Sequence, residues 1–112
     1  MFNAALIVFA ITALGGLMLA KRVLHGQFAP WFLSLLHALL GAVGLVLLII
    51  LLVQEGPSSQ TGIGFGLLVL AALGGFFLAS FHVRKKLTPK AVVVVHASVA
   101  VVGFLTLLSV VL

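Results

Sequence analysis

Long apolar runs make up most of the chain, and short polar segments separate them at regular intervals. The runs cover residues 2–20, 31–53, 62–81 and 91–112. Each has about the 20 residues that a helix needs to cross the hydrocarbon core of a membrane. The pattern predicts an all-α fold, an integral membrane four-helix bundle in which residues 1–112 form a single transmembrane domain.

Composition supports the membrane setting. Of the 112 residues, 64% are apolar and 6% are charged, whereas a soluble domain has about 25% charged residues. The first apolar run differs from a signal peptide because its charges follow the run instead of preceding it. We therefore expect residues 2–20 to form a helix of the mature protein.

The charged residues are divided unequally among the polar segments. Lys21 and Arg22 follow the first run, four more basic residues lie within 84–90, and the only acidic residue, Glu55, lies between the second and third runs. The positive-inside rule places loops 21–30 and 83–90 in the cytoplasm and both termini on the opposite side. We expect a bacterial inner membrane as the location. No soluble basic surface is left for a nucleic acid, and the lack of cysteine excludes disulfides and covalent c-type haem.

The chain repeats itself without a gap at an offset of 59 residues, the separation between His37 and His96. Residues identical at this offset include 13–16 with 72–75, 19–20 with 78–79, Pro30 with Pro89, 37–38 with 96–97, and 43–44 with 102–103. We expect two parallel units, about 1–53 and 60–112, each a helix, a basic loop and a returning helix that opens with proline. The turn-rich segment 54–61 would join them.

His37 and His96 are ionisable residues deep inside apolar segments, where such side chains are costly and usually functional. Each lies seven residues after its proline, which places both about 10 Å along their helices from the cytoplasmic end. Small residues share their helix faces: Gly41 and Gly44 with His37, and Ala100 and Gly103 with His96. Such stripes either allow close helix packing or leave room for a flat ligand.

Two imidazoles from opposite sides of a bundle suit the axial positions of haem iron. Zinc would need about four ligands, and the apolar segments hold no carboxylate or thiol to supply them. We therefore expect one haem b with His37 and His96 as its iron ligands, and a backbone carbonyl one turn earlier as the acceptor for each second ring nitrogen. The haem propionates would face the basic residues, Lys21, Arg22, Arg84, Lys85, Lys86 or Lys90.

This arrangement resembles small membrane-embedded b-type cytochromes, the four-helix, cytochrome b561-like proteins in which helix histidines bind haem b non-covalently. The resemblance covers the architecture and the pair His37 and His96. Those proteins usually have two histidine pairs at two depths, whereas one pair follows the repeat here. This departure from the family pattern supports one haem, and a complete electron path across the membrane does not follow from it. The single-haem membrane anchors of larger respiratory enzymes are similar.

The other two histidines have no equivalents at the repeat offset, because His25 aligns with Arg84 and His82 with Val23. Both are expected near the cytoplasmic surface, where polar residues need no special role, and Trp31 is expected to be an interfacial anchor. A second haem is therefore not expected.

The expected function is one-electron transfer, by a small oxidoreductase or a cytochrome subunit. The candidate partners are quinone in the lipid bilayer, a cytoplasmic reductant, superoxide or a larger respiratory complex. Association of the chain into a homo-oligomer is also possible. A second reading is a cofactor-free accessory or assembly subunit, with the histidines bonded to a backbone carbonyl or to serine. A third reading is a small proton-coupled transporter, because the length and the four spans resemble those of small multidrug-resistance exporters. Those exporters rely on a buried acidic residue in the first helix, which residues 2–20 lack. Proton coupling would therefore have to use His37 and His96.

Overall fold

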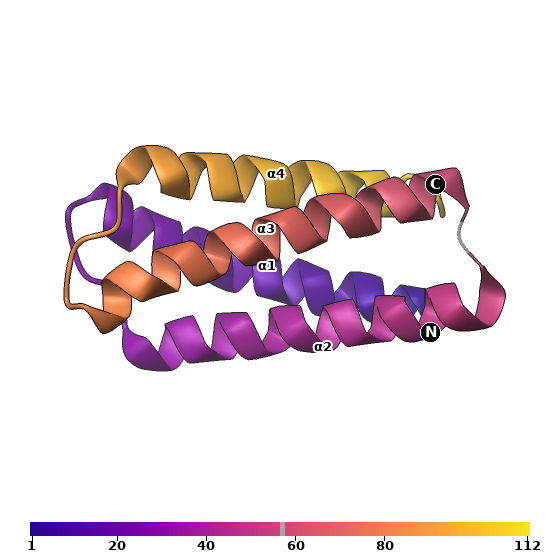
Figure 1. The fold of residues 1–112 in the computed structure, drawn as a ribbon, viewed down its shortest axis with the longest axis horizontal. Helices are drawn as coiled ribbons and strands as arrows, with labels where there is room; N and C mark the ends of the chain where they lie inside the picture. Colours follow the sequence, from indigo (N-terminus) through magenta and orange to yellow (C-terminus); the bar gives the residue numbers. More distant parts are fainter. Residues whose placement is uncertain (57) are drawn as a thin grey trace.

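The computed structural model describes residues 1–56 and 58–112, and these residues form four helices joined by short loops (Figure 1). The helices are α1 (Phe2–Leu24), α2 (Trp31–Glu55), α3 (Ser59–Val83) and α4 (Lys90–Leu108). All four are long and apolar enough to cross a membrane. The bundle is 42 Å long, against about 30 Å for a hydrocarbon core. The prediction of an all-helical chain whose four helices are long and apolar enough to span a membrane is confirmed.

The helices α1 and α3 continue past the apolar runs into the basic residues, and both end in the same kind of turn. Backbone amides of Gly26 and Gln27 bond back three and five residues, and those of Lys85 and Lys86 do the same in the second loop. Gly26 and Lys85 adopt left-handed φ angles of 74° and 58°. This turn satisfies the last carbonyls of a helix and favours glycine, because a side chain is strained there.

The helices α2 and α4 each begin directly after a proline, Pro30 or Pro89, whose backbone is extended. Proline suits this place because the first amides of a helix have no partner within it. The helix α3 begins after Ser58, whose Oγ accepts a hydrogen bond from the amide of Thr61. The expected linker 54–61 is shorter than predicted, since α2 includes Glu55 and α3 starts at Ser59. Pro57 lies outside the described residues.

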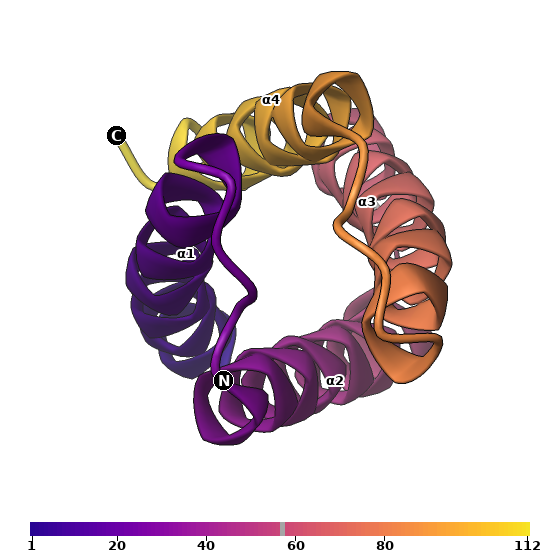
Figure 2. The same ribbon diagram turned by 90° about the vertical axis from the view of Figure 1, so that its left-hand side faces the viewer.

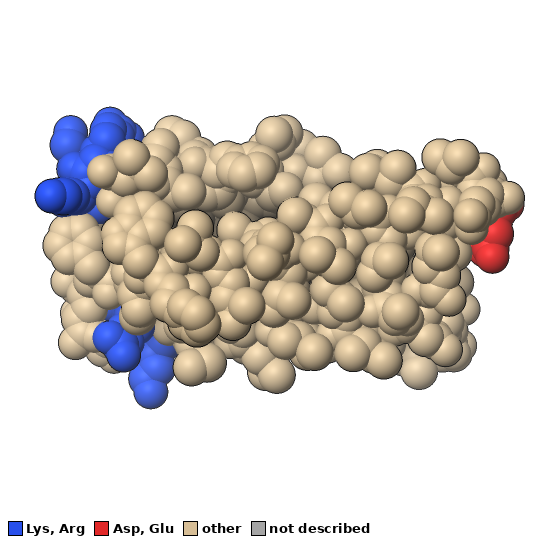
Figure 3. Space-filling model, turned by 90° about the horizontal axis from the view of Figure 1, so that it is seen from below, with Lys and Arg blue, Asp and Glu red and all other residues tan. Residues whose placement is uncertain are grey.

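The four helices stand at the corners of a square when the bundle is viewed along its length (Figure 2). The helix α1 packs against α2 and α4, and α3 packs against the same two helices. Consequently α2 and α4, which carry His37 and His96, occupy opposite corners. The basic residues gather at the end formed by the α1–α2 and α3–α4 loops, and Glu55 lies at the other end (Figure 3), where both chain termini also lie.

The apolar core lies in the half of the bundle farther from the basic loops. Its buried cluster consists of Ala5, Leu6, Phe9, Leu48, Leu51, Leu68 and Leu107. These residues come from the first halves of α1 and α3 and the last turns of α2 and α4, which meet at that end. The cluster stops short of the two histidines, so the half of the bundle that contains them depends on other contacts.

Candidate functional site

The imidazoles of His37 and His96 lie opposite each other across the bundle axis. Their ring centroids are 6.4 Å apart, and the ring planes are inclined at 79°. Both residues are half-buried. The two residues that the sequence placed at one depth are therefore brought together, and each comes from a different corner of the square.

Each imidazole makes one hydrogen bond to the backbone of the preceding helix. His37 Nδ1 lies 2.9 Å from the carbonyl oxygen of Thr12 in α1. His96 Nδ1 lies 2.7 Å from that of Ala71 in α3. A carbonyl oxygen only accepts, so Nδ1 carries the proton, and in the neutral imidazole Nε2 keeps its lone pair. Thr12 and Ala71 are themselves 59 positions apart, so the two contacts are equivalent at the repeat offset.

The acceptor predicted from the sequence was a carbonyl of the histidine's own helix, and that prediction is wrong for both residues. The rings extend away from their own helices, across to α1 and α3. A backbone carbonyl has two lone pairs, so Thr12 and Ala71 can accept from a ring as well as from their own helix. A bond to a carbonyl one turn earlier in the same helix occurs instead at His25, whose Nδ1 lies 2.6 Å from the carbonyl oxygen of Lys21.

Glycines make this approach to the neighbouring helix geometrically feasible. A Cβ placed on Gly16 would lie 2.8 Å from His37 Cε1, and one on Gly75 would lie 3.3 Å from His96 Cε1. Cβ atoms in proteins rarely come so close to a non-bonded atom of a neighbouring side chain. The second glycine of each Gly-Gly pair therefore leaves the space in which the imidazole reaches the backbone.

The small residues on the histidine faces were expected either to pack helices closely or to leave room for a ligand. They are Gly41, Gly44, Ala100 and Gly103. A Cβ on Gly44 would lie 2.6 Å from Phe9 Cε1, and one on Gly103 would lie 3.1 Å from Leu68 Cγ. One on Gly41 would lie 3.7 Å from the methyl group of Thr12, and Ala100 is half-buried. Gly44 and Gly103 thus serve close helix packing, with side chains of α1 and α3 beside them, whereas a Cβ on Gly41 would make a contact of ordinary length.

Three of the basic residues expected to meet haem propionates, Arg22, Arg84 and Lys85, are exposed at the basic end. Arg84 is held on its own helix: Nε donates to the carbonyl oxygen of Ser80 at 3.1 Å, and the guanidinium lies 4.7 Å from the ring centre of Phe81. Arg22 lines an outward-facing pocket at the end of α1. Lys85 lines a pocket of about 410 Å³ that also includes Trp31 and His82.

Two polar features at this end were not predicted from the sequence. The rings of Trp31 and His82 stack with centroids 3.8 Å apart and planes 10° from parallel, and Ser34 Oγ lies 3.4 Å from His82 Nδ1. Thr88 Oγ1, just before α4, is the buried side-chain oxygen in the described part of the chain that has no hydrogen-bond partner. Only the spacing of Trp31 and Ser34, three residues apart on one helix face, could have indicated the first feature.

Within residues 1–56 and 58–112, no group of three or more His, Cys, Asp or Glu side chains is arranged to hold one metal ion. The pair His37 and His96 offers two nitrogen ligands. No third side chain of these four types joins them among the described residues.

Comparison with known proteins assigns no function to this geometry. No family profile matches the chain, and neither do any curated proteins or solved structures.

Proposed function

We propose that the chain is a membrane b-type cytochrome that binds one haem between His37 and His96 and carries single electrons. The observation that carries the proposal is the opposed pair of imidazoles, 6.4 Å apart, each with its Nδ1 proton committed to a backbone carbonyl. Histidines that ligate a metal typically donate their other N–H in this way. The arrangement leaves two neutral Nε2 atoms as available ligands.

The separation of the rings supports the proposal. A metal ion held between the Nε2 atoms of two opposed imidazoles, with metal–nitrogen bonds of about 2 Å, would place the ring centroids roughly 6 Å apart. A protein that supplies two ligands suits a metal whose other positions are filled by a macrocycle. The unpartnered hydroxyl of Thr88 supports a polar group of the ligand at the basic end, where propionates would lie.

The residues of the chain would then have distinct roles. The carbonyls of Thr12 and Ala71 hold the Nδ1 protons, fix the ring orientation and make Nε2 more basic. Gly16 and Gly75 admit the rings. Bound haem would supply a reversible one-electron carrier. Because His37 and His96 would both hold the iron, a quinone, superoxide or a partner in a respiratory complex would exchange single electrons with the bound group without coordinating it.

We also infer the two-unit organisation, about 1–53 and 60–112, and its orientation in the membrane. Three pairs of features at the offset of 59 residues support the repeat: the histidine hydrogen bonds, the prolines before α2 and α4, and the turns after α1 and α3. The gathering of Lys and Arg at one end (Figure 3) supports a cytoplasmic location for that end.

An optical spectrum tests the haem proposal directly. Protein expressed with haem supply should show reduced-minus-oxidised bands of the b type, and His37→Ala and His96→Ala should each abolish them. His25→Ala is the matched control, because that exposed ring bonds within its own helix, and its bands should persist. Colourless wild-type protein, or bands unchanged in both ligand variants, would contradict the proposal. Colourless protein that co-purifies with a membrane complex would favour the accessory-subunit reading. Proton-dependent substrate flux in liposomes would favour the transporter reading.

A further inference from the structure

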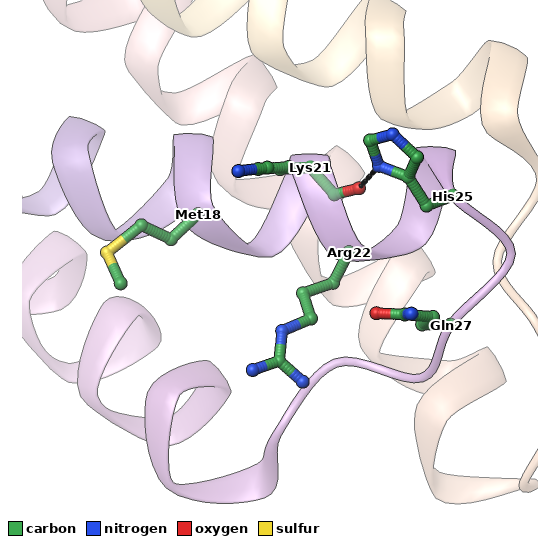
Figure 4. A pocket seen from close by; sticks show the side chains of 5 residues that line it. All are labelled: Met18, Lys21, Arg22, His25 and Gln27. Atoms are coloured by element: carbon green, nitrogen blue, oxygen red, sulfur yellow. Dashed lines mark hydrogen bonds between the residues drawn. The ribbon is translucent and has the colours of Figure 1, made fainter.

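The end of α1 has an open pocket of about 600 Å³ on the outside of the bundle. It is lined by Met18, Lys21, Arg22, His25 and Gln27. Figure 4 shows the guanidinium of Arg22 and the amide of Gln27 on the same side of α1, with Met18 farther back along the helix. The ring of His25 is fixed by its bond to the carbonyl oxygen of Lys21. The pocket thus combines hydrogen-bond donors with an apolar wall.

The electrostatics of the pocket favour an anion. Lys21 and Arg22 are adjacent cations, and the only acidic side chain of the protein, Glu55, lies at the opposite end of the bundle (Figure 3). No carboxylate side chain of this chain can therefore neutralise them. Arg84 at the same end differs, because its donors are engaged by Ser80.

An apolar stripe continues from the pocket along the outside of α1. Ile7, Ile11, Leu14 and Met18 are all exposed. Their spacing of four, three and four residues places them on one helix face, and the same face continues to Lys21 and Arg22. An anionic group at the pocket would therefore sit at the end of a hydrocarbon-facing track about as long as an acyl chain.

We propose that this surface binds an anionic phospholipid. Lys21, Arg22 and the amide of Gln27 contact its phosphate, and an acyl chain lies along the stripe of Ile7, Ile11, Leu14 and Met18. Arginine and lysine are the usual donors to phosphate oxygens, and basic pockets on the cytoplasmic side of membrane helices suit anionic head groups. The site does not include either histidine of the pair.

Native mass spectrometry of the purified full chain, with defined phosphatidylglycerol or phosphatidylcholine added, tests the proposal. The wild type should retain phosphatidylglycerol preferentially, and Lys21→Ala/Arg22→Ala should weaken that retention roughly 30-fold, the effect of removing two basic residues near a lipid surface. Lys86→Ala/Lys90→Ala removes the same charge from the same end and should leave the preference unchanged. Arg22→Lys should keep most of it.

Three results would overturn the proposal. Equal losses in the two double variants would show general attraction to a basic end instead of a site. Equal retention of both lipids by the wild type would show no selection for charge. Displacement of the lipid by inorganic phosphate at the same concentration would show a site for the free anion. Circular dichroism of each variant checks that the exposed substitutions leave the helices intact.

Discussion

The imidazole of His37 lies against the backbone of Gly16, so close that a Cβ there would be 2.8 Å from Cε1 of the ring. Gly16→Ala should therefore push the ring away from the carbonyl of Thr12. We expect a loss of about 1–3 kcal/mol in the free energy of unfolding, typical of overpacking, together with weaker haem retention. Gly75→Ala should cost less, because the corresponding distance to His96 is 3.3 Å. Thermal unfolding in detergent, followed by helicity, measures both.

Gly66→Ala is the matched control, because nothing lies within 4 Å of a Cβ placed at that position of α3. Alanine favours a helix over glycine by about 1 kcal/mol, so this variant should be as stable as the wild type or more so. If Gly16→Ala behaved like Gly66→Ala, the close packing of His37 on α1 would be refuted.

Phe9 and Gly44 form a tight contact in the apolar core, with the glycine making room for the aromatic ring. Gly44→Ala and Phe9→Ala should each destabilise the bundle, by about 1–3 kcal/mol for the overpacked alanine and about 3 kcal/mol or more for the lost ring. The double variant should lose less free energy of unfolding than the sum of the two single losses, because the smaller residue at position 9 removes the clash with alanine at position 44. A double-mutant cycle on unfolding in detergent measures the coupling, and strict additivity would contradict the contact.

Lys85 has a left-handed backbone, with φ of 58°, at the place where the first turn has Gly26. A side chain in this conformation costs about 1–2 kcal/mol, which glycine avoids. Lys85→Gly should therefore raise the unfolding temperature, and Gly26→Ala should lower it. The changes in the free energy of unfolding should be similar in size and opposite in sign. Opposite results for either variant would contradict the matched turns.

Trp31 is the only tryptophan of the chain, so its stacking on His82 can be observed without interference. His82→Ala should change the intensity of Trp31 emission and lower stability by about 0.5–1.5 kcal/mol, the typical value of an aromatic pair. His25→Ala should leave the emission as it is in the wild type. Identical spectra for the wild type and His82→Ala would refute the stacking.

The repeat and the hydropathy pattern predicted the parts of the fold and site that depend on spacing along the helix. His37 and His96 follow prolines at the same distance, so their common depth could be derived from helix geometry. The four helices could be derived too, although α1, α2 and α3 extend beyond the apolar runs because polar residues can continue a helix at the membrane surface.

Contacts between helices could not be derived in this way. The acceptors at Thr12 and Ala71 lie on neighbouring helices, so finding them required knowing how α1 meets α2 and how α3 meets α4. The Gly-Gly pairs were visible at the repeat offset. A sequence does not show, however, whether such a glycine packs against an imidazole ring or against another helix. The stack of Trp31 on His82 joins residues that are not identical at the repeat offset, so the repeat did not indicate it.

Each imidazole is oriented by the helix that comes just before its own, so both hydrogen bonds stay within one helical hairpin. Neither ring needs the other hairpin to set its direction. Two copies of one such hairpin meeting about a twofold axis would therefore present the same pair of nitrogens. The two hairpins of this chain differ elsewhere, since Lys85 stands at the position equivalent to Gly26 and His82 at the position equivalent to Val23.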